Sequence, residues 1–230
     1  MSQSAYGISF DSLKSAIEAD SNAYLSVARR YASMDTTLSF NEMFALYYGS
    51  AYMPGYSPYS DGMDSRVVEG FMEEKKYEEA LSMCRSQISK SPSTTVHYLN
   101  LGWILSTMGD SVNAQIAYDQ YYSLLSIPYR SGDGSSYKDA MVVRSVNDEY
   151  MILNAIGYRM SSQALIHNKG IPFDQMTCLN RDNPDEEKVF YFNIYQPFSI
   201  GMMSMFGGSE SGKSKKKRDR SNKKRTQRGD

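Results

Sequence analysis

The fold is decided by DGMDSRVVEGFMEEKKYEEALSMCRSQISKSPST at residues 61–94 and by the stretch that follows it, TVHYLNLGWILSTMGDSVNAQIAYDQYYSLLS at residues 95–126. The two stretches begin 34 residues apart and place small, bulky and aromatic residues at similar offsets. A period of that length is typical of helix–turn–helix units, each of which buries its apolar side against the next. The sequence therefore predicts two stacked helical hairpins.

Small residues recur where the two helices of one hairpin approach each other. Ala80 and Ala114 occupy equivalent places in the two units, and Gly102 serves the same purpose on the first helix of the second unit. Gly109 suits the left-handed residue that ends a helix, and Pro92 stops the first hairpin. The pattern resembles the tetratricopeptide repeat, although an ordinary helical bundle with similar apolar spacing is the alternative. Two repeats are fewer than the usual three, so we expect other segments to cover their open faces.

Three helices are predicted before the repeats, over residues 12–19, 22–33 and 40–52. Asp11 and Ser21 are expected to cap the first two, and Ser39 with Glu42 forms the capping box of the third. Aromatic residues on one face of that third helix predict a core position for Phe44, Tyr47 and Tyr48.

The pattern changes after residue 130. A short helix is expected over residues 147–156, and strands are expected over residues 163–167, 173–179 and 189–195. The turn residues at 181–187 favour a hairpin between the last two strands. We therefore expect an α+β fold that is mainly α, with tetratricopeptide-like hairpins, a small C-terminal antiparallel sheet and a disordered basic tail. Its parts are 1–60 with the N-terminal helices and an aromatic loop, 61–128 with the hairpins, 129–206 with the α/β portion of the same domain, and 207–230 with the tail.

Composition limits the class of protein. The chain has 230 residues and 41% hydrophobic content, enough for one sizeable core. The two cysteines, Cys84 and Cys178, do not make a disulfide framework, and Cys84 sits at a helix-packing position. No run of about 18 apolar residues indicates a transmembrane helix, and the start MSQSAYGISF lacks a secretory signal. We expect a cytoplasmic protein as written, or a cell-envelope or secreted one if the true start lies upstream.

Three segments point to a known family: DTTLSFNEMFALYYGSAYMPGYSPY at 35–59, VNDEY at 146–150 and VFYFNIYQPF at 189–198. They resemble a bacterial family of uncharacterised proteins, the domain of unknown function numbered 4919, over the chain up to about Phe206. The resemblance implies a bacterial origin, a helical-hairpin body and no established activity, so it supplies no catalytic residues. Members of that family often look exported, which keeps the compartment open.

The motif GGSESGKS at residues 207–214 matches the phosphate-binding loop of nucleotide-binding proteins. That loop needs a strand before it and a helix after it, so that backbone N–H groups converge on the phosphates. Here a methionine-rich segment precedes the motif and a lysine-rich segment follows it, so we interpret the match as accidental. No nucleotide cofactor is expected.

Other catalytic or metal-binding patterns are weak. His97 and His167 lie far apart in sequence, and no Cys/His cluster has the spacing of metal ligands, so no metal site is expected. Asp148 with Glu149 and the run at 185–187 are carboxylates in a helix cap and a turn, where solvent exposure is the usual outcome. The sequence thus predicts a protein that is not an enzyme.

A stacked pair of hairpins favours a scaffold that binds an unknown protein or peptide in its groove. In the repeat register, the groove residues of the first helices are Ser65, Glu69, Met72, Glu73, Leu99, Trp103 and Ser106. Trp103 is the best candidate anchor for a partner. The competing expectation is that Trp103 is buried beneath the C-terminal sheet.

The basic tail suggests an alternative function. Residues 210–230 carry a net charge of +7 and the rest of the chain −8, without an aromatic or aliphatic side chain in the basic run. The basic residues are Lys213, Lys215, Lys216, Lys217, Arg218, Arg220, Lys223, Lys224, Arg225 and Arg228. They favour association with nucleic acid or another anionic surface, with a solvated tail as the equal alternative.

Overall fold

A computed structural model describes residues 4–5, 8–58 and 61–207. The helices are α1 (Phe10–Ala19), α2 (Ser21–Ala32), α3 (Phe40–Gly49), the 3-10 helix η1 (Ser50–Tyr52), α4 (Asp61–Glu73), α5 (Tyr77–Lys90), α6 (Thr95–Thr107), α7 (Ser111–Tyr129), α8 (Val146–Ala155) and α9 (Tyr195–Gly207). The strands are β1 (Ser4–Ala5), β2 (Ile8–Ser9), β3 (Met141–Val142), β4 (Tyr158–Asn168), β5 (Ile171–Asn180) and β6 (Glu187–Asn193). The expected α+β fold with a mainly helical body is confirmed.

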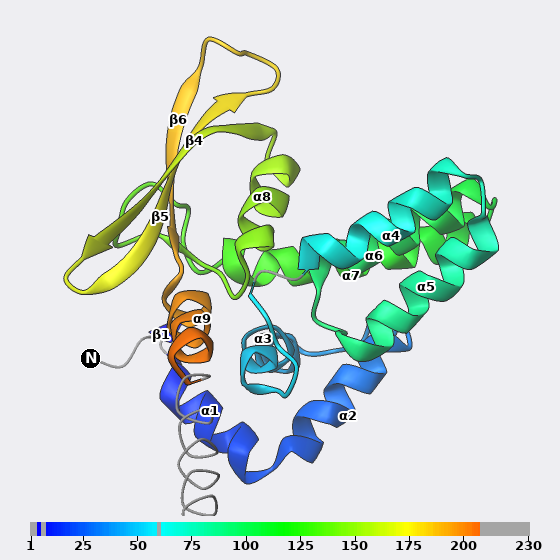
Figure 1. Cartoon of the computed structure of the whole chain (residues 1–230), viewed down its shortest axis with the longest axis horizontal. Coiled ribbons are helices and arrows are strands. Elements are labelled where there is room, and N and C mark those ends of the chain that lie inside the picture. Colours follow the sequence, from blue (N-terminus) through cyan, green and yellow to red (C-terminus); the bar gives the residue numbers. More distant parts are fainter. Residues whose placement is uncertain (1–3, 6–7, 59–60, 208–230) are drawn as a thin grey trace, which may run out of the picture.

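Helices α4 to α7 form the two hairpins in the middle of the chain. Helices α4 and α6 begin at Asp61 and Thr95, and α5 and α7 begin at Tyr77 and Ser111, so both members recur at a distance of 34 residues. Helix α5 contacts both α4 and α6, and α6 packs along α7. Figure 1 shows this layer on one side of the molecule, with the sheet on the other side of α8. Gly109, with φ of 87°, ends α6, and Asp110 caps α7.

Gly102 marks the closest approach of α6 to α7. A Cβ atom built on Gly102 would lie 2.5 Å from Cε1 of the Tyr118 ring, whereas one built on Gly70 of α4 would meet no atom within 4 Å. We expect Gly102→Ala to lower the free energy of unfolding by about 1 kcal/mol, because overpacking outweighs the gain in helix propensity. Gly70→Ala is the matched control and should raise it by up to about 1 kcal/mol. Urea unfolding measures both, and equal stabilisation by the two changes would contradict the close approach.

The N-terminal helices surround α3. The capping box of α3 is present, with the Ser39 hydroxyl accepting a hydrogen bond from the Glu42 backbone N–H. Phe44, Tyr47 and Tyr48 are buried, which confirms their expected place in the core. The caps of the two preceding helices were misplaced, because Ser9 and Asp20 stand at those positions.

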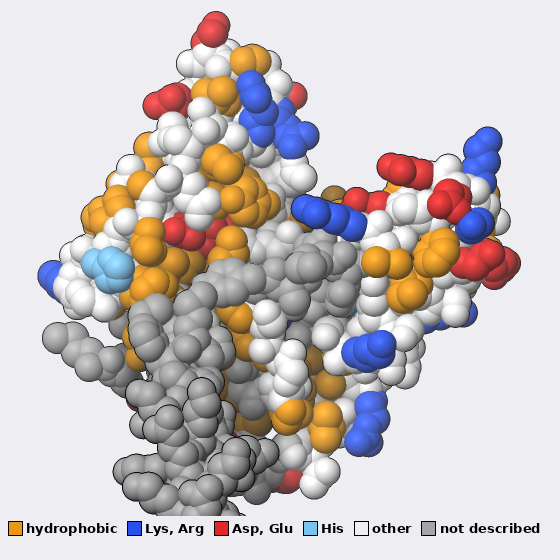
Figure 2. Space-filling view, in the orientation of Figure 1, with side chains coloured by type: hydrophobic (Ala, Val, Ile, Leu, Met, Phe, Trp, Pro, Cys, Tyr) orange, Lys and Arg blue, Asp and Glu red, His pale blue; other side chains and the backbone are white. Residues whose placement is uncertain are grey.

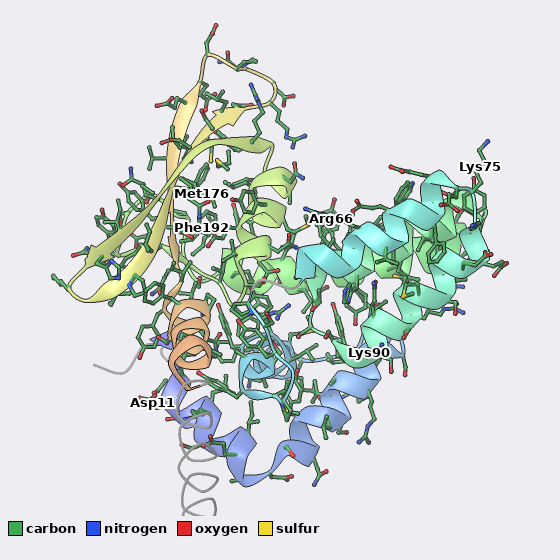
Figure 3. All side chains as sticks on the ribbon, viewed as in Figure 1. Asp11, Arg66, Lys75, Lys90, Met176 and Phe192 are labelled. Atoms are coloured by element: carbon green, nitrogen blue, oxygen red, sulfur yellow. The ribbon has the colours of Figure 1, made fainter. Side chains whose placement is uncertain are left out.

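The four-stranded sheet has the order β3-β6-β5-β4. Strands β4, β5 and β6 pair antiparallel, which confirms the expected hairpin between β5 and β6. The expectation of a wholly antiparallel sheet is wrong, because β3 pairs parallel to β6, with Met141 opposite Phe192. The chain reaches β3 after α7 and enters the sheet in the same direction as β6. Figure 3 labels Met176 and Phe192 on the sheet, near α8.

A buried segment ties the sheet to the helices. Residues 140–145 are buried throughout, and backbone carbonyls there accept hydrogen bonds from tyrosines of the N-terminal third. The Tyr48 hydroxyl donates to the Val142 carbonyl at 2.9 Å, and the Tyr56 hydroxyl donates to the Arg144 carbonyl. The segments that were expected to cover the hairpins therefore come from both sides of them in sequence, from the N-terminal helices and from the part of the chain that follows α7. In the described ranges, no helix has the length and apolar content to cross a lipid bilayer.

Candidate binding cleft

A cleft of about 1110 Å³ lies between α2 and the C-terminal half of α5. The loop at 53–57 and the turn at 91–94 also line it, and the buried Arg144 lies in its floor. Lys90, labelled in Figure 3, stands where the end of α5 meets α2. The walls therefore come from segments that are distant in sequence and meet only in the folded chain.

Positive charge gathers in the cleft. Arg29 of α2, Arg85 and Lys90 of α5, and Arg144 line it, and none of the described lining residues is acidic. Residues 1–209 as a whole carry a net charge of −8, so this distribution opposes the average. Figure 2 shows basic side chains in blue over the region where α5 approaches α2, without a red side chain between them.

The rest of the lining is mixed. Six serines and one threonine face the cleft, together with aliphatic and methionine side chains such as Leu25, Met34, Met53 and Ile88. Burial raises the pKa of the Tyr24 phenol, while the charge of Arg144 and hydrogen bonds with serines of the floor oppose the rise. The cleft thus offers hydrogen-bonding groups and apolar contacts side by side, as binding sites for organic ligands and peptides do.

Met34 enters the cleft from an unusual backbone position. Its φ is 64°, in the left-handed region that glycine normally occupies after a helix. The Asp35 N–H donates to the Arg30 carbonyl and the Met34 N–H donates to the Tyr31 carbonyl, which is the hydrogen-bond pattern of a Schellman C-cap. A side chain at this position costs about 1 kcal/mol, and here it places a flexible thioether on the rim of the cleft.

The floor of the cleft is a buried polar network around Arg144 and Asp148. Arg144 Nη2 donates to the Ser93 carbonyl at 2.8 Å, and its Nε lies 3.8 Å from Oδ2 of Asp148. The Asp148 carboxylate also accepts hydrogen bonds from the hydroxyls of Tyr47 at 2.7 Å and Thr95 at 2.9 Å. Arg144 and Asp148 are exposed over only 2% and 0% of their surfaces. The guanidinium is therefore held in place before any ligand arrives.

The next residue, Glu149, belongs to a second buried cluster. Its carboxyl is within hydrogen-bonding reach of Asp174 on β5, and no other described side chain hydrogen-bonds either Glu149 oxygen. Burial raises the pKa of Glu149 well above its ordinary value, and the nearby Asp174 and Asp148 carboxylates add to the rise. Burial also raises the pKa of Asp174, against hydrogen bonds from Gln163 and Glu149. Two ionised carboxylates repel and cannot donate to each other, so protonation of Glu149 relieves the repulsion between the two.

The expected solvent exposure of Asp148 and Glu149 is therefore wrong. Ser145 caps α8, and the first turn of that helix points into the helical body instead of toward water. The carboxylates at 185–187 are exposed, as expected. A signal for the buried site was present, because Arg144 is an isolated cation inside the apolar run AMVVRSV.

The residues predicted to line the hairpin groove differ in their exposure to solvent. Ser65 and Met72 are buried, which corrects their assignment as partner-binding residues. The Asn100 side chain donates to the Ser65 hydroxyl at 2.9 Å, because this face of α4 packs on α6. Glu69, Glu73 and Ser106 are exposed, and Leu99 is partly buried. None of the seven predicted residues lines the cleft.

Trp103 is exposed over 42% of its surface, so the expectation that it is buried beneath the sheet is wrong. The sheet packs through α8, away from the outer face of α6. Its role as an anchor for a partner stays a prediction.

Other features concern thiols, histidines and the tail. Cys84 is buried, and burial raises the pKa of its thiol to about 12, consistent with a packing role. Among the described residues, no three His, Cys, Asp or Glu side chains are grouped as metal ligands; His97 is buried and His167 is exposed. The phosphate-loop match beyond Gly207 and the basic residues from Lys213 to Arg228 lie outside the described residues.

Comparisons with curated proteins and with solved structures find no match. A family model does match, over residues 11–203, and its description is a domain of unknown function, DUF4919. The match includes the N-terminal helices, the hairpins, α8 and the sheet, and hence every described residue that lines the cleft. The chain therefore belongs to the family of the domain of unknown function DUF4919.

Proposed function

We propose that this protein is a non-catalytic binding module that holds a peptide segment of another protein in the cleft between α2 and α5. The observation that carries the proposal is the cleft itself, with its volume of about 1110 Å³ and its mixture of hydroxyl, apolar and basic side chains. A peptide presents backbone amides and side chains of several kinds, and such a lining can serve all of them.

Two further features favour a peptide. Met34 and Met53 both line the cleft, and methionine adapts its shape to different partners. Serines of α5, of the loop at 53–57 and of the turn at 91–94 line the cleft and offer several hydroxyl groups for hydrogen bonds. Such a distribution suits an extended chain with a repeated backbone.

The floor favours binding over catalysis. The Asp148 carboxylate is occupied by Tyr47, Thr95 and Arg144, and Arg144 in turn donates to the Ser93 carbonyl. A general acid or base has to reach a proton of the substrate, whereas the ionisable groups of the floor are bound to one another and to neighbouring hydroxyl and carbonyl groups. Their role in the proposal is to fix the shape and charge of the cleft.

Filling the cleft tests the proposal. Ser89 lines the cleft on α5, whereas Ser86 is exposed on the same helix and does not line it. A library of displayed peptides is first selected on the wild-type protein, and the selected peptides are then measured by fluorescence anisotropy. We expect Ser89→Trp to weaken binding at least tenfold and Ser86→Trp to leave it unchanged. Equal binding by both variants would place the peptides elsewhere and overturn the proposed site.

A further inference from the structure

We infer that the cleft selects acidic peptide segments, in which carboxylates alternate with apolar side chains. This inference rests on the proposed function and names the chemical class of the ligand. It is carried by the charge of the walls, by the fixed cation in the floor and by the apolar groups between them.

The walls carry positive charge on both sides. Arg29 projects from α2, and Arg85 and Lys90 project from α5, so a ligand in the cleft passes between cations. All three are exposed, and none of them forms an ion pair with a carboxylate of the described residues. Complementary charge of this kind speeds association and rejects partners of the wrong sign. A basic peptide would meet repulsion from both walls.

The floor adds a cation that is already positioned. Arg144 is held by the Ser93 carbonyl, by Asp148 and by the face of the Tyr47 ring, 5.5 Å from the guanidinium carbon to the ring centroid. Asp148 offsets part of its charge, so Arg144 contributes the positive potential of the floor while the wall residues make the direct contacts. Because that potential acts from a buried site, salt screens it less than the charges of the walls.

The apolar lining decides between a peptide and a nucleic acid. Leu25, Met34, Met53 and Ile88 lie among the basic residues. Side chains of an acidic peptide can use these contacts, whereas the sugar–phosphate backbone cannot. Single-stranded nucleic acids usually stack their bases on exposed aromatic rings. The two aromatic residues of the cleft are the buried Tyr24 and the partly buried Tyr56, whose hydroxyl donates to the Arg144 carbonyl.

The experiment compares three labelled peptides of equal length, in which Leu alternates with Glu, Gln or Lys. Fluorescence anisotropy is measured on the full chain at 0.05 and 0.5 M NaCl, concentrations chosen to span weak and strong screening (about 14 to 4 Å). We expect the Glu peptide to bind at least tenfold more tightly than the Gln peptide, and the Lys peptide not to bind. The advantage of the Glu peptide should shrink at high salt.

Charge reversal supplies the matched variants. Arg29→Glu combined with Lys90→Glu should weaken binding of the Glu peptide at least tenfold and should allow the Lys peptide to bind. Arg66→Glu combined with Lys75→Glu makes the same change of net charge at two exposed residues that do not line the cleft, and both residues are labelled in Figure 3. This control should change neither the affinity for the Glu peptide nor that for the Lys peptide. Circular dichroism confirms that both double variants remain folded.

The outcomes separate the two proposals. If the Gln peptide binds as tightly as the Glu peptide and Ser89→Trp blocks both, the cleft binds peptides without charge selection and only the present inference fails. If no peptide binds, selected or designed, the proposed function fails with it. If a fluorescent oligothymidylate binds more tightly than the Glu peptide and loses affinity on Arg29→Glu with Lys90→Glu, the ligand class is nucleic acid and the inference is overturned.

Discussion

Asp148→Ala should lower the free energy of unfolding by about 3–5 kcal/mol, the cost of breaking a buried ion pair from one side. The carboxylate has no exposed surface, and it accepts hydrogen bonds from Tyr47 and Thr95 besides facing Arg144. Without it, two buried hydroxyls lose their acceptor and a buried guanidinium loses its counter-charge. Both losses fall on groups that are almost fully buried, where an unpaired charge or hydroxyl is costly.

Urea unfolding followed by circular dichroism measures this effect. Asp185→Ala is the matched control, because Asp185 is an acidic residue of the same type in an exposed loop, and it should change stability by less than about 0.5 kcal/mol. If the two alanine variants were equally stable, the network in the floor of the cleft would contribute nothing to the fold. A reduced slope of the unfolding curve would indicate instead that the variant is less compact before it unfolds.

Glu149→Gln should make the protein more stable than the wild type at pH 8–9. The folded state raises the pKa of Glu149 because of burial and because of the Asp174 and Asp148 carboxylates. A carboxyl with a raised pKa contributes stability that is complete below its unfolded pKa of about 4.3 and is lost as the pH rises through the folded value. Glutamine keeps a donor for Asp174 and never ionises. We expect its advantage at pH 8–9 to reach at least about 1 kcal/mol, the cost of an unsatisfied buried group.

The test is the difference in unfolding free energy between wild type and variant, measured by urea unfolding from pH 5 to pH 9. The difference should grow with pH in favour of Glu149→Gln, and the wild type should be at least as stable as the variant at pH 5. Glu78→Gln, on the exposed side of α5, is the control and should give a difference that does not vary with pH. A constant difference for Glu149→Gln as well would mean that the carboxyl pair does not share a proton.

Local patterns in the sequence account for most of the secondary structure. Ala80 and Ala114 recur 34 residues apart, and this recurrence predicted two equivalent hairpins. Both residues are buried. The strand expected over residues 189–195 corresponds to β6, in which Phe190 and Phe192 are both buried. These features depend on neighbours within a few residues, which is why a single sequence reveals them.

The cleft and the buried carboxyls depend on contacts that no local pattern contains. Arg29 and Lys90 come to line one cleft only when α2 packs beside α5, so their shared role has no signature in sequence. An acidic residue in the first turn of a helix normally faces water and favours the helix dipole. Asp148 keeps this position in the first turn of α8 although it is buried, because the hydroxyls of Tyr47 and Thr95 donate the hydrogen bonds that water would otherwise supply.

The parallel pairing of β3 with β6 bears on how the protein can be divided. The polypeptide returns through its own interior at residues 140–145, and the hydroxyls of Tyr47 and Tyr48 donate to Asp148 and to the Val142 carbonyl, both of which follow α7 in the chain. The Gln196 side chain adds a further tie by donating to the Tyr48 carbonyl at 2.9 Å. A chain that ended after α7 would lack these hydrogen-bond partners of Tyr47 and Tyr48. The hairpins therefore do not form an independent unit, and grafting experiments should transfer the whole span from α1 to α9.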